Sequence, residues 1–96
     1  MNLRLVQFNL EPGQRAEATT IADRVLPVIR AQPGCSRGEF FADYEAGEYG
    51  IVAVWESKGA ADAAAGIVSP ILMSALTEAN ATAERRRLYE VYEQRP

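Results

Sequence analysis

The sequence predicts one α+β domain with the ferredoxin-like order β-α-β-β-α-β, in which a four-stranded antiparallel sheet carries its helices on one face. Three observations lead to this prediction. The apolar run Ile-Val-Ala-Val-Trp at residues 51–55 is typical of a strand covered on both faces. Two long stretches carry apolar residues at helical spacing, and each lies between segments of strand character. A chain of 96 residues forms a single hydrophobic core, so residues 1–96 are expected to be one domain.

The first predicted strand spans residues 3–10. Val6, Phe8 and Leu10 alternate with more polar residues, so one face of this strand is apolar and the other is mixed. We expect the apolar face to meet the helices. The turn signal Glu11-Pro12-Gly13 ends the strand.

The first predicted helix spans residues 14–31, where apolar residues repeat at helical spacing. Pro27 lies inside this helix and conflicts with the pattern. A proline removes one backbone hydrogen bond and crowds the carbonyl four residues earlier. We therefore expect a kink or a break near Leu26, and we expect the turn Gln32-Pro33-Gly34 to end the helix.

The next two strands are predicted to form a hairpin. Residues 35–43, centred on Glu39-Phe40-Phe41, form the second strand, and residues 49–55 form the third. Gly47 lies in the loop between them, as is usual for a tight connection between antiparallel strands.

Two short helices are predicted after the third strand. Ser57 is a suitable N-cap for an alanine-rich helix that ends near residue 65, and Gly66 is expected to stop that helix in a left-handed conformation. Ser69 and Pro70 then supply a new cap and a first-turn proline for a helix that continues to about residue 80.

Residues 85–93 form the last predicted strand, with Leu88 on one face and Arg87 and Tyr89 on the other. Both helical regions then lie on one face of the sheet. The opposite face carries Leu5 and apolar residues of the central strands. If this face were left in contact with water, a large apolar patch would be exposed. We therefore predict a homodimer in which the two sheets pack against each other about a twofold axis.

Composition and charge exclude several classes of function. A net charge of −3 provides no basic face for nucleic acid or for an anionic membrane. No apolar run approaches the roughly 20 residues of a membrane span, and the first residues lack the features of a signal peptide. The single cysteine fits a reducing environment, so we expect a cytoplasmic protein. Histidine is absent and no glycine-rich phosphate loop occurs, so we expect neither a metal nor a cofactor.

Several segments, taken in order, resemble the antibiotic biosynthesis monooxygenase family, which has the dimeric α+β barrel fold. The most specific are Pro33-Gly34-Cys35 after the first helix and Trp55-Glu56-Ser57-Lys58 after the third strand. The resemblance covers nearly the whole chain. Its other parts are Leu26-Pro27-Val28-Ile29-Arg30, Glu39-Phe40-Phe41-Ala42-Asp43, Gly47-Glu48-Tyr49, Ser69-Pro70 and Leu88-Tyr89-Glu90-Val91.

The resemblance implies that the protein oxygenates an electron-rich aromatic, such as a phenol, a quinol or a polyketide anthrone, without metal or flavin. Such a substrate, once deprotonated, passes an electron to O₂ itself. The protein then supplies a dry pocket, donors for the substrate anion and a proton acceptor. A small aromatic molecule is therefore the expected substrate or ligand, and a histidine-assisted version of the reaction is excluded.

The haem-degrading branch of the family is tested by three positions. That branch has an asparagine on the first strand, a tryptophan after the third strand and a histidine in the last helix. The corresponding positions here are Val6, Ala64 and Ser74. We therefore predict that the protein does not degrade haem.

The candidate pocket residues come partly from the resemblance and partly from the character and position of the residues themselves. A tryptophan at the end of the third strand lines the cavity in family members, which implies Trp55 here, although a lone tryptophan is more often a core anchor. Arg37 would stabilise an anion if it faced inward, and the alternative is an ion pair with Glu39, Glu90 or a carboxylate of the partner chain. No catalytic base is predicted. The remaining candidates for the pocket wall are Val6, Phe8, Phe40, Met73 and Tyr89.

Two other functions remain open at this point. One is a non-catalytic small-molecule-binding protein on the same dimeric barrel, and the other is an isomerase or lyase. The enzyme hypotheses require an enclosed pocket of roughly 300 Å³ or more with at least two convergent polar groups. A space between sheet and helices that is filled by side chains would favour a binding or structural role.

Overall fold

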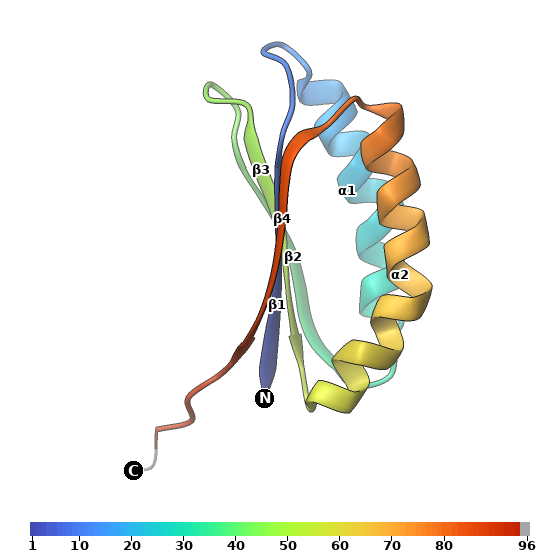
Figure 1. The fold of residues 1–96 in the computed structure, drawn as a ribbon, viewed down its shortest axis with the longest axis vertical. Helices are drawn as coiled ribbons and strands as arrows, with labels where there is room; N and C mark the ends of the chain where they lie inside the picture. Colours follow the sequence, from blue (N-terminus) through green and yellow to red (C-terminus); the bar gives the residue numbers. More distant parts are fainter. Residues whose placement is uncertain (95–96) are drawn as a thin grey trace.

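The computed structural model describes residues 1–94, which form four strands and two helices. Along the chain they are β1 (Asn2–Asn9), α1 (Arg15–Arg30), β2 (Cys35–Asp43), β3 (Glu48–Trp55), α2 (Lys58–Glu78) and β4 (Thr82–Glu90). The strands lie in the order β2-β3-β1-β4, and all neighbouring pairs are antiparallel. Both helices cover the same face of the sheet (Figure 1). The predicted fold class is confirmed.

The two central strands, β1 and β3, direct alternate side chains into the core. In their register Val6 lies opposite Ile51 and Phe8 lies opposite Tyr49. All four side chains are buried, and Trp55 is buried at the end of β3. The prediction that the apolar face of the first strand meets the helices is therefore confirmed.

Helix α1 runs through Pro27 without the predicted break. Its buried residues lie on both sides of the proline, with Ala22 and Val25 before it and Ile29 after it. Packing of this continuous apolar stripe on the sheet outweighs the loss of one backbone hydrogen bond. The helix ends where it was expected to end, before the turn at residues 32–34.

The prediction of two short helices after the third strand is wrong, because α2 is one helix of 21 residues. Its start is as predicted: the Ser57 Oγ accepts a hydrogen bond of 3.1 Å from the backbone N–H of Ala60. Gly66 does not adopt a left-handed conformation. Pro70 lies inside the helix, and its ring would crowd the carbonyl of Gly66, a residue without a Cβ and with open space beside it.

The continuity of α2 also changes the expectation about apolar runs. Within residues 1–94, α2 is long and apolar enough to span a membrane by length and composition alone. The core helix of a globular domain passes the same test, and α2 buries Ala64, Val68 and Leu72 against the rest of the protein. The length of α2 therefore carries no assignment to a membrane.

Strand β4 begins at Thr82, three residues before its predicted start, and ends at Glu90, before the predicted end. An irregularity in its pairing with β1 lies between Gln7 and Asn9. Ala83 adopts a positive φ of 53° at this irregularity, which periodicity alone does not reveal. Beyond the irregularity, Arg86 lies opposite Val6.

The face of the sheet opposite the helices is bare of other elements within residues 1–94 (Figure 1). Its central part carries half-buried aliphatic side chains, among them Leu3, Leu5 and Val52. Two aromatic side chains on the outer strands are more exposed, Phe41 and Tyr89. This face is the one that the sequence predicts to form a dimer contact.

Candidate functional site

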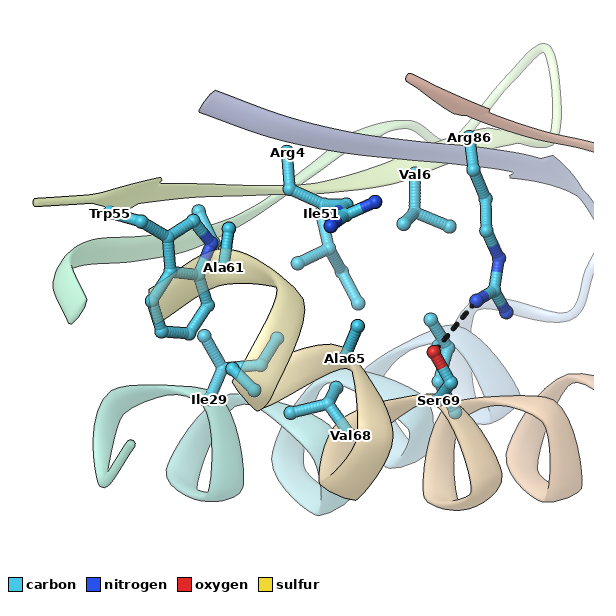
Figure 2. A pocket seen from close by; sticks show the side chains of 13 residues that line it. Arg4, Val6, Ile29, Ile51, Trp55, Ala61, Ala65, Val68, Ser69 and Arg86 are labelled. Atoms are coloured by element: carbon cyan, nitrogen blue, oxygen red, sulfur yellow. Dashed lines mark hydrogen bonds between the residues drawn. The ribbon is translucent and has the colours of Figure 1, made fainter. Parts of the chain in front are cut away.

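An apolar cavity lies between α2 and the helix-facing side of the sheet (Figure 2). Its volume is about 50 Å³, so the cavity in this structure is well below the roughly 300 Å³ that the enzyme hypotheses require. That is smaller than the cavity of roughly 150 Å³ that holds a benzene molecule. The lining residues come from β1, β3, β4 and both helices, and they are Arg4, Val6, Ile29, Ile51, Ala53, Trp55, Ala61, Ala64, Ala65, Val68, Ser69, Leu72 and Arg86.

Trp55 forms one end of this cavity. It is the last residue of β3, and only 3% of its surface is exposed. Its indole Nε1 is buried and has no hydrogen-bond partner among residues 1–94. Figure 2 shows this nitrogen on the edge of the ring that faces the other lining residues. Trp55 is therefore both a core anchor and a cavity wall, the two roles that the sequence left open.

Arg86 forms the opposite end of the cavity. Its Nη1 donates a hydrogen bond of 3.0 Å to the Ser69 Oγ on α2, and its Nη2 lies 3.4 Å from the Glu84 Oε1. Its Nε is buried and has no partner within residues 1–94. A buried N–H without an acceptor is costly, so it marks a position where a ligand can complete the hydrogen bonding.

Arg4 lies between these two ends, and an ion pair with Asp62 holds its guanidinium at the edge of the cavity. Its Nη2 lies 3.4 Å from the Asp62 Oδ1, and the Lys58 Nζ lies 3.0 Å from the Asp62 Oδ2. The hydrogen bond from Lys58 holds the pKa of Asp62 below its ordinary value, and the positive charges of Lys58 and Arg4 act in the same direction. Asp62 therefore stays ionised and compensates part of the charge of Arg4.

The polar groups of the cavity are almost all donors. Its lining contains two guanidinium groups, an indole N–H and the Ser69 hydroxyl, and it contains no carboxylate and no tyrosine. Such a lining favours a ligand with acceptor oxygens, above all an anion. It provides no side chain that would act as a general base. Among residues 1–94 no three side chains of the Cys, Asp or Glu type lie together as a metal site would require.

Of the predicted pocket residues, the structure brings only Val6 and Trp55 to the cavity. Phe8 and Phe40 lie next to it, in an aromatic cluster with Tyr49 whose ring centroids are 5.9 to 6.5 Å apart. This cluster fills the end of the core near the hairpin. Phe8 and Phe40 therefore limit the cavity through packing instead of lining it.

Three further candidates lie outside the cavity. Met73 is 45% exposed, because it falls on the side of α2 that faces away from the sheet. Tyr89 is 49% exposed on the bare face of β4. The Arg37 side chain is 72% exposed, and its Nε lies 3.9 Å from the Glu39 Oε1, which is the ion pair that the sequence left as the alternative.

Arg4 and Arg86 were missed by the sequence reasoning, although strand periodicity contains the signal for both. Arg4 lies two residues before Val6 and therefore on the same apolar face. Arg86 shares a face with Leu88 for the same reason, although it lies within the basic run of residues 85–87, a pattern that is more typical of a solvated strand end. Continuing the apolar face by one step on each strand would have found both arginines.

The fold and this site place the protein in a known class. Residues 1–66 match the model of the antibiotic biosynthesis monooxygenase family, so the chain belongs to that family. The matched region contains Arg4 and Trp55, but Ser69 and Arg86 lie beyond it. No curated protein matches the chain.

Solved structures of low sequence identity share the fold. A Deinococcus radiodurans protein assigned to the antibiotic biosynthesis monooxygenases is 19% identical, with a TM-score of 0.78 over 100% of this chain and 97% of its own. SnoaB from Streptomyces nogalater, a cofactor-independent oxygenase, is 19% identical, with a TM-score of 0.73 over 99% and 96%. Rv0793 from Mycobacterium tuberculosis is 17% identical, with a TM-score of 0.74 over 97% and 96%. At these identities the likeness concerns the fold alone.

Proposed function

We propose that the protein is a cofactor-independent monooxygenase that oxidises an electron-rich aromatic, such as a quinol, a phenol or a polyketide anthrone, with O₂. The observation that carries this proposal is the cavity beneath α2, in which two buried N–H donors, Trp55 Nε1 and Arg86 Nε, have no protein acceptor. Membership of the antibiotic biosynthesis monooxygenase family supports it, as does the shared fold with SnoaB.

The lining of the cavity suits an ionised substrate. A positive charge near a phenol or an enol stabilises the anion and lowers the pKa of that substrate, so the substrate gives its proton to solvent water as it enters, without a carboxylate base in the wall. The anion passes an electron to O₂, and the two radicals combine at carbon. For an anthrone, one oxygen atom of O₂ converts the CH₂ group to C=O. The second oxygen atom leaves as water with the two hydrogen atoms of that group. The apolar walls, Val6, Ile51 and Val68, keep bulk water from this exchange.

Binding of such a substrate requires the cavity to enlarge. A volume of about 50 Å³ is too small for one aromatic ring. The side of the cavity formed by α2 consists largely of small side chains, including Ala61, Ala64 and Ala65. Such a wall interlocks weakly with the sheet, so we propose that α2 moves outward when the substrate enters.

We further propose that two copies of the chain pack through the bare faces of their sheets. Leu3, Leu5 and Val52 on this face are only half-buried within one chain, and Phe41 and Tyr89 flank them. A second sheet would remove this apolar surface from water. Light scattering should give twice the mass of the 10.5 kDa chain, and a monomer at micromolar concentration would contradict the proposal.

A second function, non-catalytic binding of a small molecule in the same cavity, is favoured by one observation. The cavity lining contains no carboxylate, tyrosine or other group able to take a proton near neutral pH. A protein that only binds an anionic ligand needs donors and an apolar wall, and both are in place. Catalysis, in contrast, requires the substrate to ionise through the electrostatics of the site alone.

Oxygen uptake separates the two functions. Purified, metal-stripped protein is tested with a panel of hydroquinones and anthrones in the presence of a chelator. Uptake that requires both protein and substrate supports the monooxygenase, and it should fall at least tenfold in Arg86→Gln. The control is Arg15→Gln, the same change at an exposed arginine at the start of α1 that does not line the cavity, and it should keep its activity. No uptake with any member of the panel would contradict the oxygenase and leave the binding function.

A further inference from the structure

The two unpartnered donors of the cavity lie at its opposite ends. In the sheet register, Arg86 lies opposite Val6, and Val6 lies opposite Ile51. Trp55 is four residues beyond Ile51 on β3, which corresponds to roughly 13 Å along the strand. Figure 2 shows the same separation, with Trp55 at one end of the view and Arg86 at the other. One ligand atom therefore cannot satisfy both donors.

The two ends differ in charge. The Arg86 guanidinium is positive, and two of its three nitrogens are already engaged by the side chains of Ser69 and Glu84. The Nε is left, and a charged N–H prefers an ionised oxygen. The Trp55 indole N–H is a neutral donor and cannot accept, so it prefers an uncharged carbonyl or ether oxygen.

The middle of the cavity is apolar. Val6 and Ile51 on the sheet face Ala65 and Val68 on α2 (Figure 2). The Arg4 charge at its edge is already met by Asp62. A ligand that fits this lining has a flat apolar body with an oxygen at each end.

We propose that the ligand of this cavity is a two-ended planar molecule, with an ionised oxygen on Arg86 Nε and an uncharged acceptor oxygen on Trp55 Nε1. This inference rests on the proposed function, because the ligand is the substrate that the same cavity would oxidise. It narrows the substrate class to monoanions whose two oxygen groups lie across the ring from each other. A ligand with an anionic end alone leaves the indole N–H without an acceptor. A neutral ligand offers the Arg86 Nε only an uncharged acceptor, which binds it more weakly, because the Glu84 carboxylate pairs with Nη2 and not with Nε.

Isothermal titration calorimetry with four probes tests this pattern. 4-Acetylbenzoate has a carboxylate and a carbonyl at opposite ends of a ring. Benzoate lacks the neutral acceptor, methyl 4-acetylbenzoate lacks the charge, and 3-acetylbenzoate has both groups in the wrong relation. We expect 4-acetylbenzoate to bind at least tenfold more tightly than each of the other three. Benzoate and 3-acetylbenzoate leave the indole N–H without an acceptor, and the methyl ester offers the Arg86 Nε only an uncharged oxygen.

Variants assign each end. Arg86→Gln should remove the preference over the methyl ester, and Trp55→Phe should remove the preference over benzoate. Arg15→Gln should keep both preferences, because Arg15 is exposed at the start of α1 and does not line the cavity. If a variant fails to fold, the affinities of the four probes for the wild-type protein still test whether the ligand has two ends of this kind.

The failures of this inference and of the proposed function are distinguishable. Equal affinity for the four probes, or binding of none of them, would overturn the two-ended ligand even if oxygen uptake is observed. A clear preference for 4-acetylbenzoate without oxygen uptake from any quinol or anthrone would keep the two-ended site and overturn the oxygenase.

Discussion

Filling the cavity beneath α2 should stabilise the protein and abolish its function. Ala65 lies in the cavity wall between Ile51 and Val68 (Figure 2), so Ala65→Val places two methyl groups in the void. A void costs about 24 cal/mol per Å³. Applied to the volume of about 50 Å³, this gives a gain of about 1.2 kcal/mol in the free energy of unfolding.

The helix propensity of valine opposes this gain. Valine in place of alanine costs up to about 0.7 kcal/mol in a helix. The net gain for Ala65→Val is then about 0.5 kcal/mol, or roughly 2–4 °C in Tm for a domain of this size. Ala63→Val is the matched control, because Ala63 is exposed on the same helix and pays only the propensity cost.

The assay is thermal and urea denaturation of the two variants, followed by oxygen uptake. Ala65→Val should melt roughly 5–10 °C above Ala63→Val, because the difference between them isolates the filled void. Ala65→Val should also lose oxygen uptake, whereas Ala63→Val should keep it. If Ala65→Val is no more stable than Ala63→Val, the wall next to Ala65 contains no usable void and the assignment of the site fails.

Three further changes test the core, a turn and an exposed charge. Trp55→Ala should lower the free energy of unfolding by about 3–5 kcal/mol in urea denaturation, because a nearly fully buried indole is lost; a variant as stable and active as the wild type would refute both roles of this residue. Gly47→Ala should cost more than Gly13→Ala in the same assay. Both positions have a positive φ, which costs roughly 1–2 kcal/mol for alanine, but only at Gly47 does the new Cβ meet the carbonyl oxygen of Leu10; equal costs would contradict the close contact. Asp62→Asn should lower Tm at pH 7, and the gap should close as the pH falls below 3.8, the ordinary pKa. Because the pKa of Asp62 is lower in the folded state than in the unfolded state, the ionised carboxylate stabilises the folded protein above pH 3.8, and this stabilisation is lost as the carboxylate is protonated at lower pH. A difference in Tm between the two proteins that persists at pH 2 would refute this account.

Part of the site was accessible to sequence reasoning. The place of Trp55 followed from a short apolar strand and a cap at Ser57, which are both local features. Strand alternation also determines that Val6 faces the helices. The same alternation placed Arg86 on the face of Leu88, but the neighbouring arginines concealed its role.

Other parts of the site were not accessible. Met73 carries an apolar side chain on an apolar helix, and only the docking angle of α2 decides that it faces solvent. Phe8 and Phe40 are core residues in either case, and the packing with Tyr49 keeps them out of the cavity wall. Side-chain packing of this kind depends on contacts between residues far apart in the sequence.

By itself, the sequence determined the order of strands and helices, the faces of the strands and the start of α2. These features depend on periodicity, caps and turns within a few residues of each other. The tertiary structure alone decided that both helices continue through their prolines, because burial of a long apolar stripe on the sheet outweighs one lost hydrogen bond. It also decided that Arg86 and Trp55 close the two ends of one cavity, because strand register brings together residues that are 31 positions apart.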